Sequence, residues 1–238
     1  MNWSFSTILD LVFGAPGFPQ IQIYLLRHGQ TQANVHEVDH REVGDCNVFQ
    51  TAIGHKQSED AGRSIGPGFL RSSLVYYAPY KRHHQALDCV LRGAGIARSE
   101  LLFCREEDLV RERDIGYDDY WEQEDLQARH GLFYYRLANG GEAPSDCCMR
   151  VGLFLPSLIR EIRRQQPKGV LIVTSGMFIA CFVKRFFHLT VDQFHNLGHP
   201  HNGDIVKIAP KHMLQSPLFT TKRWGVVGLR TLSEAAPA

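Results

Sequence analysis

The sequence lacks any marked excess of charge, any paired-cysteine metal motif and any long hydrophobic run. Lys and Arg number 26 against 25 Asp and Glu, a net charge of +1, which argues against a nucleic-acid scaffold. The six cysteines show no CxxC spacing and are expected to be reduced thiols in a cytoplasmic protein. The longest apolar run, 176–187, contains Lys184 and Arg185 and is too short to span a bilayer, so we expect no membrane partner.

The N-terminal segment also lacks the features of a secretion signal. Its apolar stretch is not preceded by basic residues, and Asp10 interrupts it before any small-residue cleavage site, so we expect no signal peptide. The chain contains no internal repeat and no low-complexity tract. We therefore expect an N-terminal extension over 1–20, a single domain over 21–230 with its own core, and a C-terminal tail over 231–238.

Short apolar runs alternate with amphipathic segments along this domain. The runs predict buried strands and the periodic segments predict helices. The expected strands cover 21–26, 74–77, 170–174 and, more weakly, 205–208; the expected helices cover 54–65, 80–92, 146–164 and 176–187. Pro156 lies inside one of these helices and should kink or break it. The alternation predicts an α/β three-layer sandwich with a mostly parallel central sheet.

A charged stretch interrupts this alternation from about residue 105 to 145. It contains many acidic residues and is followed by an aromatic segment. We expect it to form an insertion that folds as a cap over one edge of the sheet.

The turn after the first expected strand carries side chains suited to an anion. Arg27 and His28 are followed by Gly29, which permits close backbone approach, and then by Thr31 and Asn34. In open α/β sheets, ligands bind at the carboxyl ends of the strands. A guanidinium beside an imidazole therefore predicts an anion site that includes a possible nucleophile.

A second arginine follows the next expected strand. Arg82 lies in the first turn of the helix after 74–77, so it can point toward the same end of the sheet as Arg27. Two converging guanidiniums can hold a phosphoryl group and neutralise its charge.

With these two elements, the chain resembles the histidine phosphatase superfamily, in its phosphoglycerate-mutase-like branch. The resemblance extends from Ile21 to Ile208. It rests on RHGQTQAN at 27–34, TAIGHKQ at 51–57, YAPYKR at 77–82 and RERDIG at 111–116, and, for a eukaryote-type subgroup of small mutase-like phosphatases, on 128–146 and 184–194.

The resemblance implies a two-step reaction that requires no cofactor and no metal. His28 attacks the phosphoryl group to give a phosphohistidine, Glu112 protonates the leaving oxygen, and water hydrolyses the intermediate. Glu106 and Glu107 remain alternative proton donors. The residues expected to contact the phosphoryl group or the substrate are Arg27, Arg82, Asn34, Thr31, Thr51, Gly54, Gly176 and Met177.

The sequence departs from the family pattern at Ser175. After the strand at 170–174 the family places a second histidine that contacts the phosphoryl group, whereas this chain has Ser175 followed by Gly176. Loss of one preorganised donor costs about a hundred- to a thousand-fold in rate. Three explanations stay open: a naturally impaired protein, compensation by His199 or His201, or an introduced substitution.

The remaining histidines give weaker predictions. His195, His199 and His201 have spacings compatible with metal binding, but Gly and Pro between them indicate a loop, and no cysteine or paired carboxylate completes a site, so we expect no metal. His83 and His84 follow Arg82 and are expected to be exposed.

The expected function is phosphomonoester hydrolysis, with a small phosphorylated substrate or inorganic phosphate as the ligand. A phosphoglycerate-type mutase is less favoured because the acidic run at 117–125 would repel a small polyanion, although Arg129 and Arg136 argue the other way. Tyr117, Tyr120 and Trp121 offer aromatic surface for a less charged or ring-bearing substrate. A phosphate-binding pseudoenzyme or protein-interaction module remains an alternative, and the oligomeric state is left open.

Overall fold

The computed structural model describes residues 21–116, 126 and 128–232, and within them the chain forms a seven-stranded sheet in the order β3-β2-β4-β1-β5-β7-β6. β3, β2, β4 and β1 are parallel neighbours, whereas β5, β7 and β6 join the sheet through antiparallel pairs. The strands are β1 (Gln22–Arg27), β2 (Ser73–Tyr77), β3 (Phe103–Glu106), β4 (Gly169–Thr174), β5 (Ile205–Pro210), β6 (Phe219–Thr220) and β7 (Trp224–Val227).

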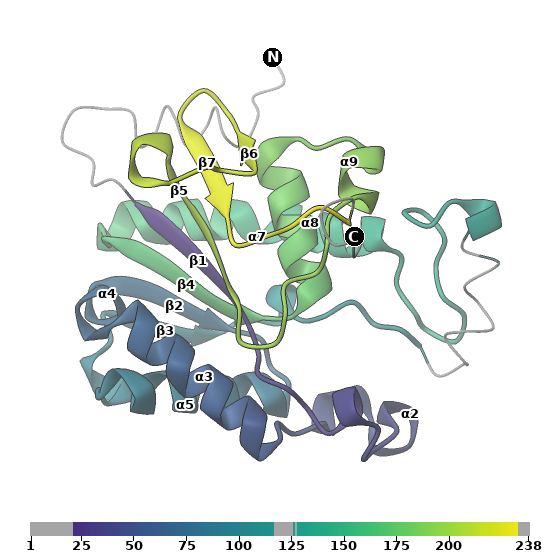
Figure 1. Ribbon diagram of the computed structural model, residues 1–238, viewed down its shortest axis with the longest axis horizontal. Coiled ribbons are helices and arrows are strands. Elements are labelled where there is room, and N and C mark those ends of the chain that lie inside the picture. Colours follow the sequence, from purple (N-terminus) through teal and green to yellow (C-terminus); the bar gives the residue numbers. More distant parts are fainter. Residues whose placement is uncertain (1–20, 117–125, 127, 233–238) are drawn as a thin grey trace, which may run out of the picture.

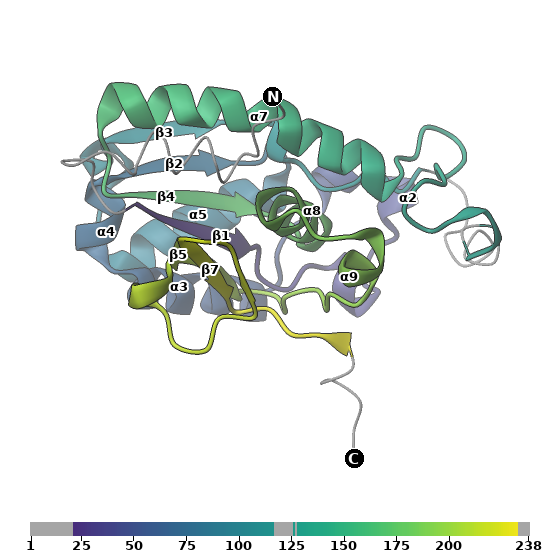
Figure 2. The same cartoon turned by 90° about the horizontal axis from the view of Figure 1, so that it is seen from above.

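Helices cover both faces of the sheet and make three layers (Figures 1 and 2). One face packs against α7 and α8, and the other against α3, α4 and α5. The α-helices are α2 (His40–Val43), α3 (Ala52–Ile65), α4 (Pro67–Arg71), α5 (Lys81–Ala94), α7 (Pro144–Gln165), α8 (Gly176–Phe187) and α9 (Val191–His195). Short 3-10 helices are η1 (Ala33–Val35), η2 (Asp45–Asn47), η3 (Arg98–Glu100), η4 (Asp108–Val110) and η5 (Lys211–Met213).

The structure confirms the α/β prediction, and β1, β2, β4 and β5 form where apolar runs predicted strands. The strands β3, β6 and β7 were not predicted. Because β3 pairs with β2 as far as Glu106, residues 105 and 106 belong to the sheet. The described residues between η4 and α7 extend past the carboxyl ends of the parallel strands in both views (Figures 1 and 2).

Pro156 does not break α7, which continues from Pro144 to Gln165. A proline inside a helix removes one hydrogen bond and costs about 3 kcal/mol or more. Here Phe154, Leu155 and Leu158 are buried in the core around the proline. Burial of each such side chain contributes about 1.5 to 3 kcal/mol, so the packing of this face outweighs the local cost.

The topology places several loops at one edge of the sheet. β1 lies between β4 and β5, and β4 lies between β1 and β2, so the segments that follow β1, β2 and β4 are neighbours. The loop before β5 joins them, since the amide of Gly203 donates to the carbonyl oxygens of Arg27 and His28. In the described part of the chain, no helix has the length and apolar character needed to cross a membrane.

Candidate active site

His28 lies at the carboxyl end of β1 with only 5% of its surface exposed. Its Nδ1 is 2.8 Å from the carbonyl oxygen of Gly29, so Nδ1–H donates and Nε2 keeps its lone pair. Burial, together with the positive charges of Arg82 and Arg27, holds the pKa of His28 well below its usual range. The imidazole is therefore neutral at pH 7.

The two arginines predicted from the sequence lie near enough to this imidazole for their charges to lower its pKa. Arg27 donates from Nη1 to the carbonyl oxygen of Pro200 at 2.6 Å, and its buried Nε–H has no acceptor among the described residues. A buried donor without an acceptor is costly unless a ligand supplies one. Burial lowers the pKa of Arg27, but a guanidinium keeps its charge at neutral pH.

Arg82 is buried and is held by Asp45, a residue that the sequence analysis did not identify. Its Nη1 donates to the carbonyl oxygen of Asp45 at 2.7 Å and to the carboxylate Oδ1 at 2.9 Å, and its Nη2 donates to Oδ2 at 3.0 Å. A guanidinium carries five N–H donors. The Nε–H and the second Nη2–H of Arg82 therefore stay available for a phosphoryl oxygen.

Glu112 places its carboxyl group at the first turn of α8. Oε2 accepts a hydrogen bond from the amide of Met177 at 3.4 Å, and Oε1 accepts one from the amide of Arg113 at 2.7 Å. The negative charge of Glu112 acts to raise the pKa of Arg27, so the carboxyl group lies near this guanidinium. The rival carboxylates have other partners: Glu106 pairs with His84 at 2.9 Å and Glu107 with Arg105 at 2.6 Å.

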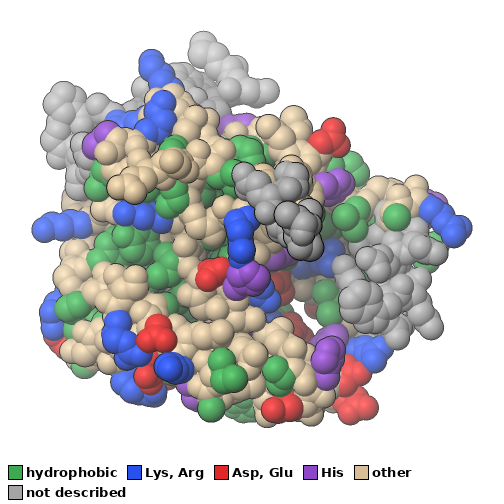
Figure 3. Space-filling model, in the orientation of Figure 1, with side chains coloured by type: hydrophobic (Ala, Val, Ile, Leu, Met, Phe, Trp, Pro, Cys, Tyr) green, Lys and Arg blue, Asp and Glu red, His purple; other side chains and the backbone are tan. Residues whose placement is uncertain are grey.

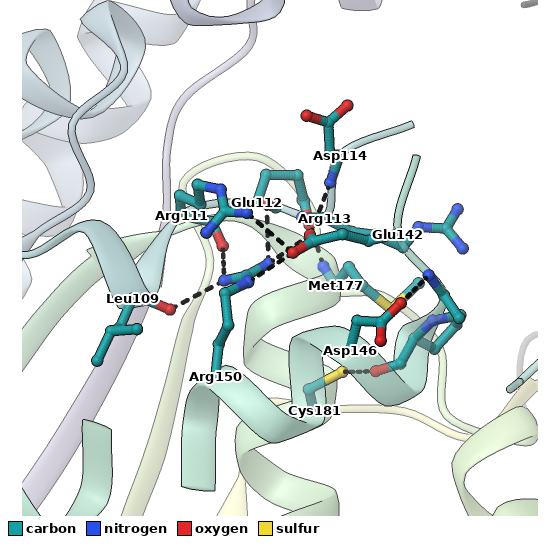
Figure 4. A network of polar contacts seen from close by, with 12 residues as sticks. Leu109, Arg111, Glu112, Arg113, Asp114, Glu142, Asp146, Arg150, Met177 and Cys181 are labelled. Carbon is teal, nitrogen blue, oxygen red and sulfur yellow. Dashed lines mark hydrogen bonds and ion pairs between the residues drawn. The ribbon is translucent and has the colours of Figure 1, made fainter. Parts of the chain in front are cut away.

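A buried arginine from α7 holds the segment that carries Glu112 (Figure 4). Arg150 donates to the carbonyl oxygens of Leu109, Arg111 and Glu112 at 2.9, 2.9 and 3.1 Å. The carboxylate of Glu142 accepts from Arg150 at 2.9 and 2.8 Å and from Arg111 at 2.9 Å. Neighbouring carbonyl groups along the segment thus share one cationic partner, which fixes the backbone at Glu112.

Thr51 and Gly54 fasten the loop after β1 to the start of α3. Thr51 Oγ1 caps the helix by accepting from the amide of Gly54 at 3.1 Å, and its hydroxyl donates to Gln30 Oε1 at 2.9 Å. A Cβ on Gly54 would lie 2.0 Å from the carbonyl oxygen of Gln30, so only glycine allows this approach. Both residues therefore shape the site through the backbone.

Thr31 and Asn34 hydrogen-bond to each other at the end of the same loop. Asn34 Oδ1 accepts from the amide of Thr31 at 3.0 Å, and Thr31 Oγ1 accepts from the amide of Asn34 at 3.3 Å. Asn202, which the sequence analysis missed, donates to Asn34 Oδ1 and to the carbonyl oxygen of His28, both at 3.2 Å. The amide nitrogen of the Asn34 side chain remains a donor for a ligand.

Ser175 follows β4 as the N-cap of α8 and is fully buried. Its Oγ is 2.7 Å from Nε2 of His83, a residue on α5. The expectation that His83 is exposed is wrong, because its exposed fraction is 0%. His84 is partly exposed at the outer side of the same helix, where it pairs with Glu106.

Gly176 and Met177 begin α8 next to Ser175. A Cβ on Gly176 would lie 2.8 Å from His199 Nδ1 and 3.7 Å from Arg27 Cζ, so His199 already lies against this end of the helix. His201 is exposed, and its amide donates to Asp204 at 2.7 Å. Among the described residues, no group of three or more His, Cys, Asp or Glu is placed to hold a metal ion.

A pocket of about 220 Å³ opens beside Met177 and His199. Phe194 and Leu197 provide apolar walls of this pocket, and Arg113 also lines it. On the surface, histidine side chains lie beside Lys or Arg near the centre of the face drawn in Figure 3, over the loops that follow the strands. The site thus combines a cationic centre with an adjoining, largely apolar hollow.

The chain belongs to the histidine phosphatase superfamily, branch 1, whose family model matches residues 23–218. This match confirms the resemblance seen in the sequence.

Two curated relatives fit this assignment. The chain is 28% identical over 202 residues to the phosphoglycerate mutase-like protein AT74 of Arabidopsis thaliana, a match that covers 77% of this chain and 63% of AT74. It is 26% identical over 110 residues to the broad-range acid phosphatase DET1 of Saccharomyces cerevisiae, covering 43% of this chain and 33% of that protein. The matches thus span less than two thirds of each relative.

Solved structures share the fold. A mycobacterial glucosyl-3-phosphoglycerate phosphatase in complex with VO3 superimposes with a TM-score of 0.65 at 19% identity, covering 87% of this chain and 98% of that chain. The alpha-ribazole phosphatase from Shigella flexneri gives a TM-score of 0.63 at 18% identity, with coverage of 88% and 96%. These neighbours are phosphatases, and at such identities they establish the architecture alone.

Proposed function

We propose that this chain hydrolyses phosphate monoesters through a covalent phosphohistidine on His28. The observation that carries the proposal is the state of this imidazole: it is buried and neutral, and its Nδ1–H is held by Gly29, so Nε2 presents a lone pair. The positive charges of Arg27 and Arg82 both lower the pKa of His28, so both guanidiniums lie near the imidazole. They would stabilise the charge on the phosphoryl oxygens.

The reaction has two balanced steps. In the first, His28 Nε2 forms a bond to phosphorus while the bond to the ester oxygen breaks, and Glu112 gives its proton to the departing oxygen. In the second, the Glu112 carboxylate takes a proton from water as that water attacks phosphorus. The bond to His28 then breaks, inorganic phosphate leaves, and His28 and Glu112 return to their starting states.

The geometry favours a small phosphorylated substrate with an apolar leaving group. The pocket beside Met177 adjoins the amide that contacts Glu112, so a leaving group there lies next to the proposed acid. Phosphatase activity is preferred to mutase activity because Arg136, a candidate for binding a second anion, is engaged with Asp146 at 2.8 and 2.6 Å. The acidic run at 117–125 and its aromatic residues lie outside the described residues.

Two further features belong to the proposal. The cationic groups that the reaction needs come from Arg27 and Arg82, so we expect no metal requirement, and treatment with EDTA should leave the rate unchanged. All six cysteines are free thiols, which supports function in a reducing compartment such as the cytoplasm.

The test uses hydrolysis of 4-nitrophenyl phosphate and acid-labile, base-stable labelling of the protein. The unaltered chain should turn over this ester and carry the label, and His28→Ala should lose both. The matched control is His84→Ala, which changes a partly exposed histidine of α5 and should keep both. Equal activity in His28→Ala would refute the nucleophile assignment; vanadate binding without turnover would favour the phosphate-binding module instead.

A further inference from the structure

A second buried imidazole lies beside the proposed nucleophile. The ring of His83 packs edge-on against the ring of His28, with 5.2 Å between the centroids and an interplanar angle of 75°. His83 follows Arg82 at the start of α5, and its Nε2 is 2.7 Å from Ser175 Oγ. These contacts join a helix on one face of the sheet to the end of β4.

The hydrogen-bond pattern assigns the proton of this imidazole. Nδ1 of His83 is buried and has no partner among the described residues. A buried N–H without an acceptor is costlier than a bare ring nitrogen, so the single proton of the neutral ring belongs on Nε2. Burial lowers the pKa of His83 well below its usual range, which keeps the ring neutral.

This tautomer determines whether the Ser175 hydroxyl accepts or donates the hydrogen bond with His83. Nε2–H of His83 donates to Ser175 Oγ, so the serine oxygen acts as acceptor toward the imidazole and its own O–H is left to donate elsewhere. Ser175 precedes the first turn of α8, the turn that Arg27 and Glu112 also approach. A hydroxyl held in this way gives a neutral donor at the centre defined by His28, Arg27 and Arg82.

We infer that His83 is a positioning residue that orients the Ser175 hydroxyl toward the phosphoryl group, so that the two side chains together provide the donor expected from a histidine at position 175. The inference rests on the proposed function, since it concerns the same site. It differs from compensation by His199 or His201, one of the three explanations that the sequence left open. His199 contacts Gly176, whereas it is His83 that bonds to the serine.

The first experiment measures kcat and KM for 4-nitrophenyl phosphate in a double-mutant cycle. Ser175→Ala and His83→Ala should each lower kcat by about a hundredfold, the effect of one preorganised donor, with little change in KM. The double variant should be no slower than the slower single variant, because both changes remove one donor. His83→Gln should keep most of the activity, since the Gln amide can donate to Ser175 Oγ. His84→Ala is the matched control.

The second experiment places an imidazole at position 175, with and without the side chain of His83. Because Ser175 is fully buried against His83, Ser175→His has no room while His83 is present and should not raise the rate. The combined His83→Ala, Ser175→His variant should recover activity relative to either Ala variant. Thermal unfolding of each variant, and its affinity for vanadate, show whether a slow variant is folded and still binds an oxyanion.

The outcomes separate this inference from the proposed function. Unchanged kcat in a folded His83→Ala variant, additive effects in the cycle, or a rate increase in Ser175→His alone would overturn the role of His83. In those cases the label on His28 would persist, and the proposed function would stand. Absence of label from the unaltered chain, together with unchanged hydrolysis in His28→Ala, would remove both.

Discussion

Replacement of Arg150 by methionine tests how the protein holds its proposed proton donor. Methionine is of similar length to the arginine stem but has no N–H groups, so the carbonyl oxygens of Leu109, Arg111 and Glu112 lose a donor. The carboxylate of Glu142 loses its bidentate partner and keeps Arg111.

The expected effect follows from burial. Arg150 and Glu142 have side-chain exposures of 9% and 15%, so this ion pair is screened little by water. Removing one member of a buried pair costs about 3 to 5 kcal/mol. Because Arg111 still reaches Glu142, we expect the lower end, about 3 kcal/mol of unfolding free energy.

The change should also affect catalysis through Glu112. A displacement of about 1 Å in a catalytic group can cost about a hundredfold in rate. Urea unfolding measures the stability, and kcat for glycerol phosphate against 4-nitrophenyl phosphate measures the acid step, because only the poorer leaving group depends strongly on protonation.

Arg136→Met is the control for this prediction. Arg136 is 69% exposed and pairs with Asp146 at the surface, so its loss should cost little stability and leave both rates unchanged. A loss below about 1 kcal/mol in Arg150→Met would refute the energetic reasoning. A large loss of stability with an unaltered ratio of the two rates would refute the link to Glu112.

Three further predictions concern the same site. Glu112→Gln should slow glycerol phosphate hydrolysis far more than 4-nitrophenyl phosphate hydrolysis, and equal slowing of both would count against an acid role. Gly54→Ala should displace the loop at Gln30, where a Cβ would lie 2.0 Å from the carbonyl oxygen, and should lower both kcat and the melting temperature. His28 and His83 have lowered folded-state pKa values, so below about pH 6.5 the unfolded chain binds protons that the folded chain does not. Unfolding free energy should therefore fall as pH drops from 7 to 5, by up to about 1.4 kcal/mol per pH unit for each histidine. Urea unfolding of a variant with both His28→Ala and His83→Ala should show a weaker dependence of the unfolding free energy on pH.

Buried regular elements were predictable from sequence, whereas short edge elements were not. β1, β2 and β4 are apolar because helices cover both faces of the parallel sheet. Such strands appear in the sequence as continuous apolar runs. β3 has the sequence FCRE and β6 has two residues, so neither strand is long enough to show an alternation of apolar and polar residues. Their pairing is set by neighbouring strands, which a local pattern does not record.

The sequence pointed to candidate site residues near strand ends, but it did not reveal residues whose role depends on burial. Arg27 ends β1, His28 follows it, and Arg82 lies in the first turn of α5, the helix after β2. His83 was judged by its polarity, yet it is in helical phase with Ala86, Leu87 and Val90, all buried on the inner face of α5. That phase was a signal available in the sequence. The link between Arg82 and Asp45 spans a loop, and nothing in the residue spacing encodes it.

The hydrogen bonds between Arg82 and Asp45 affect how tightly the site can bind an oxyanion. A long side chain that is ordered only when its ligand arrives loses rotamer freedom at that moment, at a cost of about 0.5 to 1.5 kcal/mol. Here the guanidinium plane is already fixed by three hydrogen bonds to one residue, so that entropy is lost when the chain folds. The site is in this respect preorganised for an oxyanion.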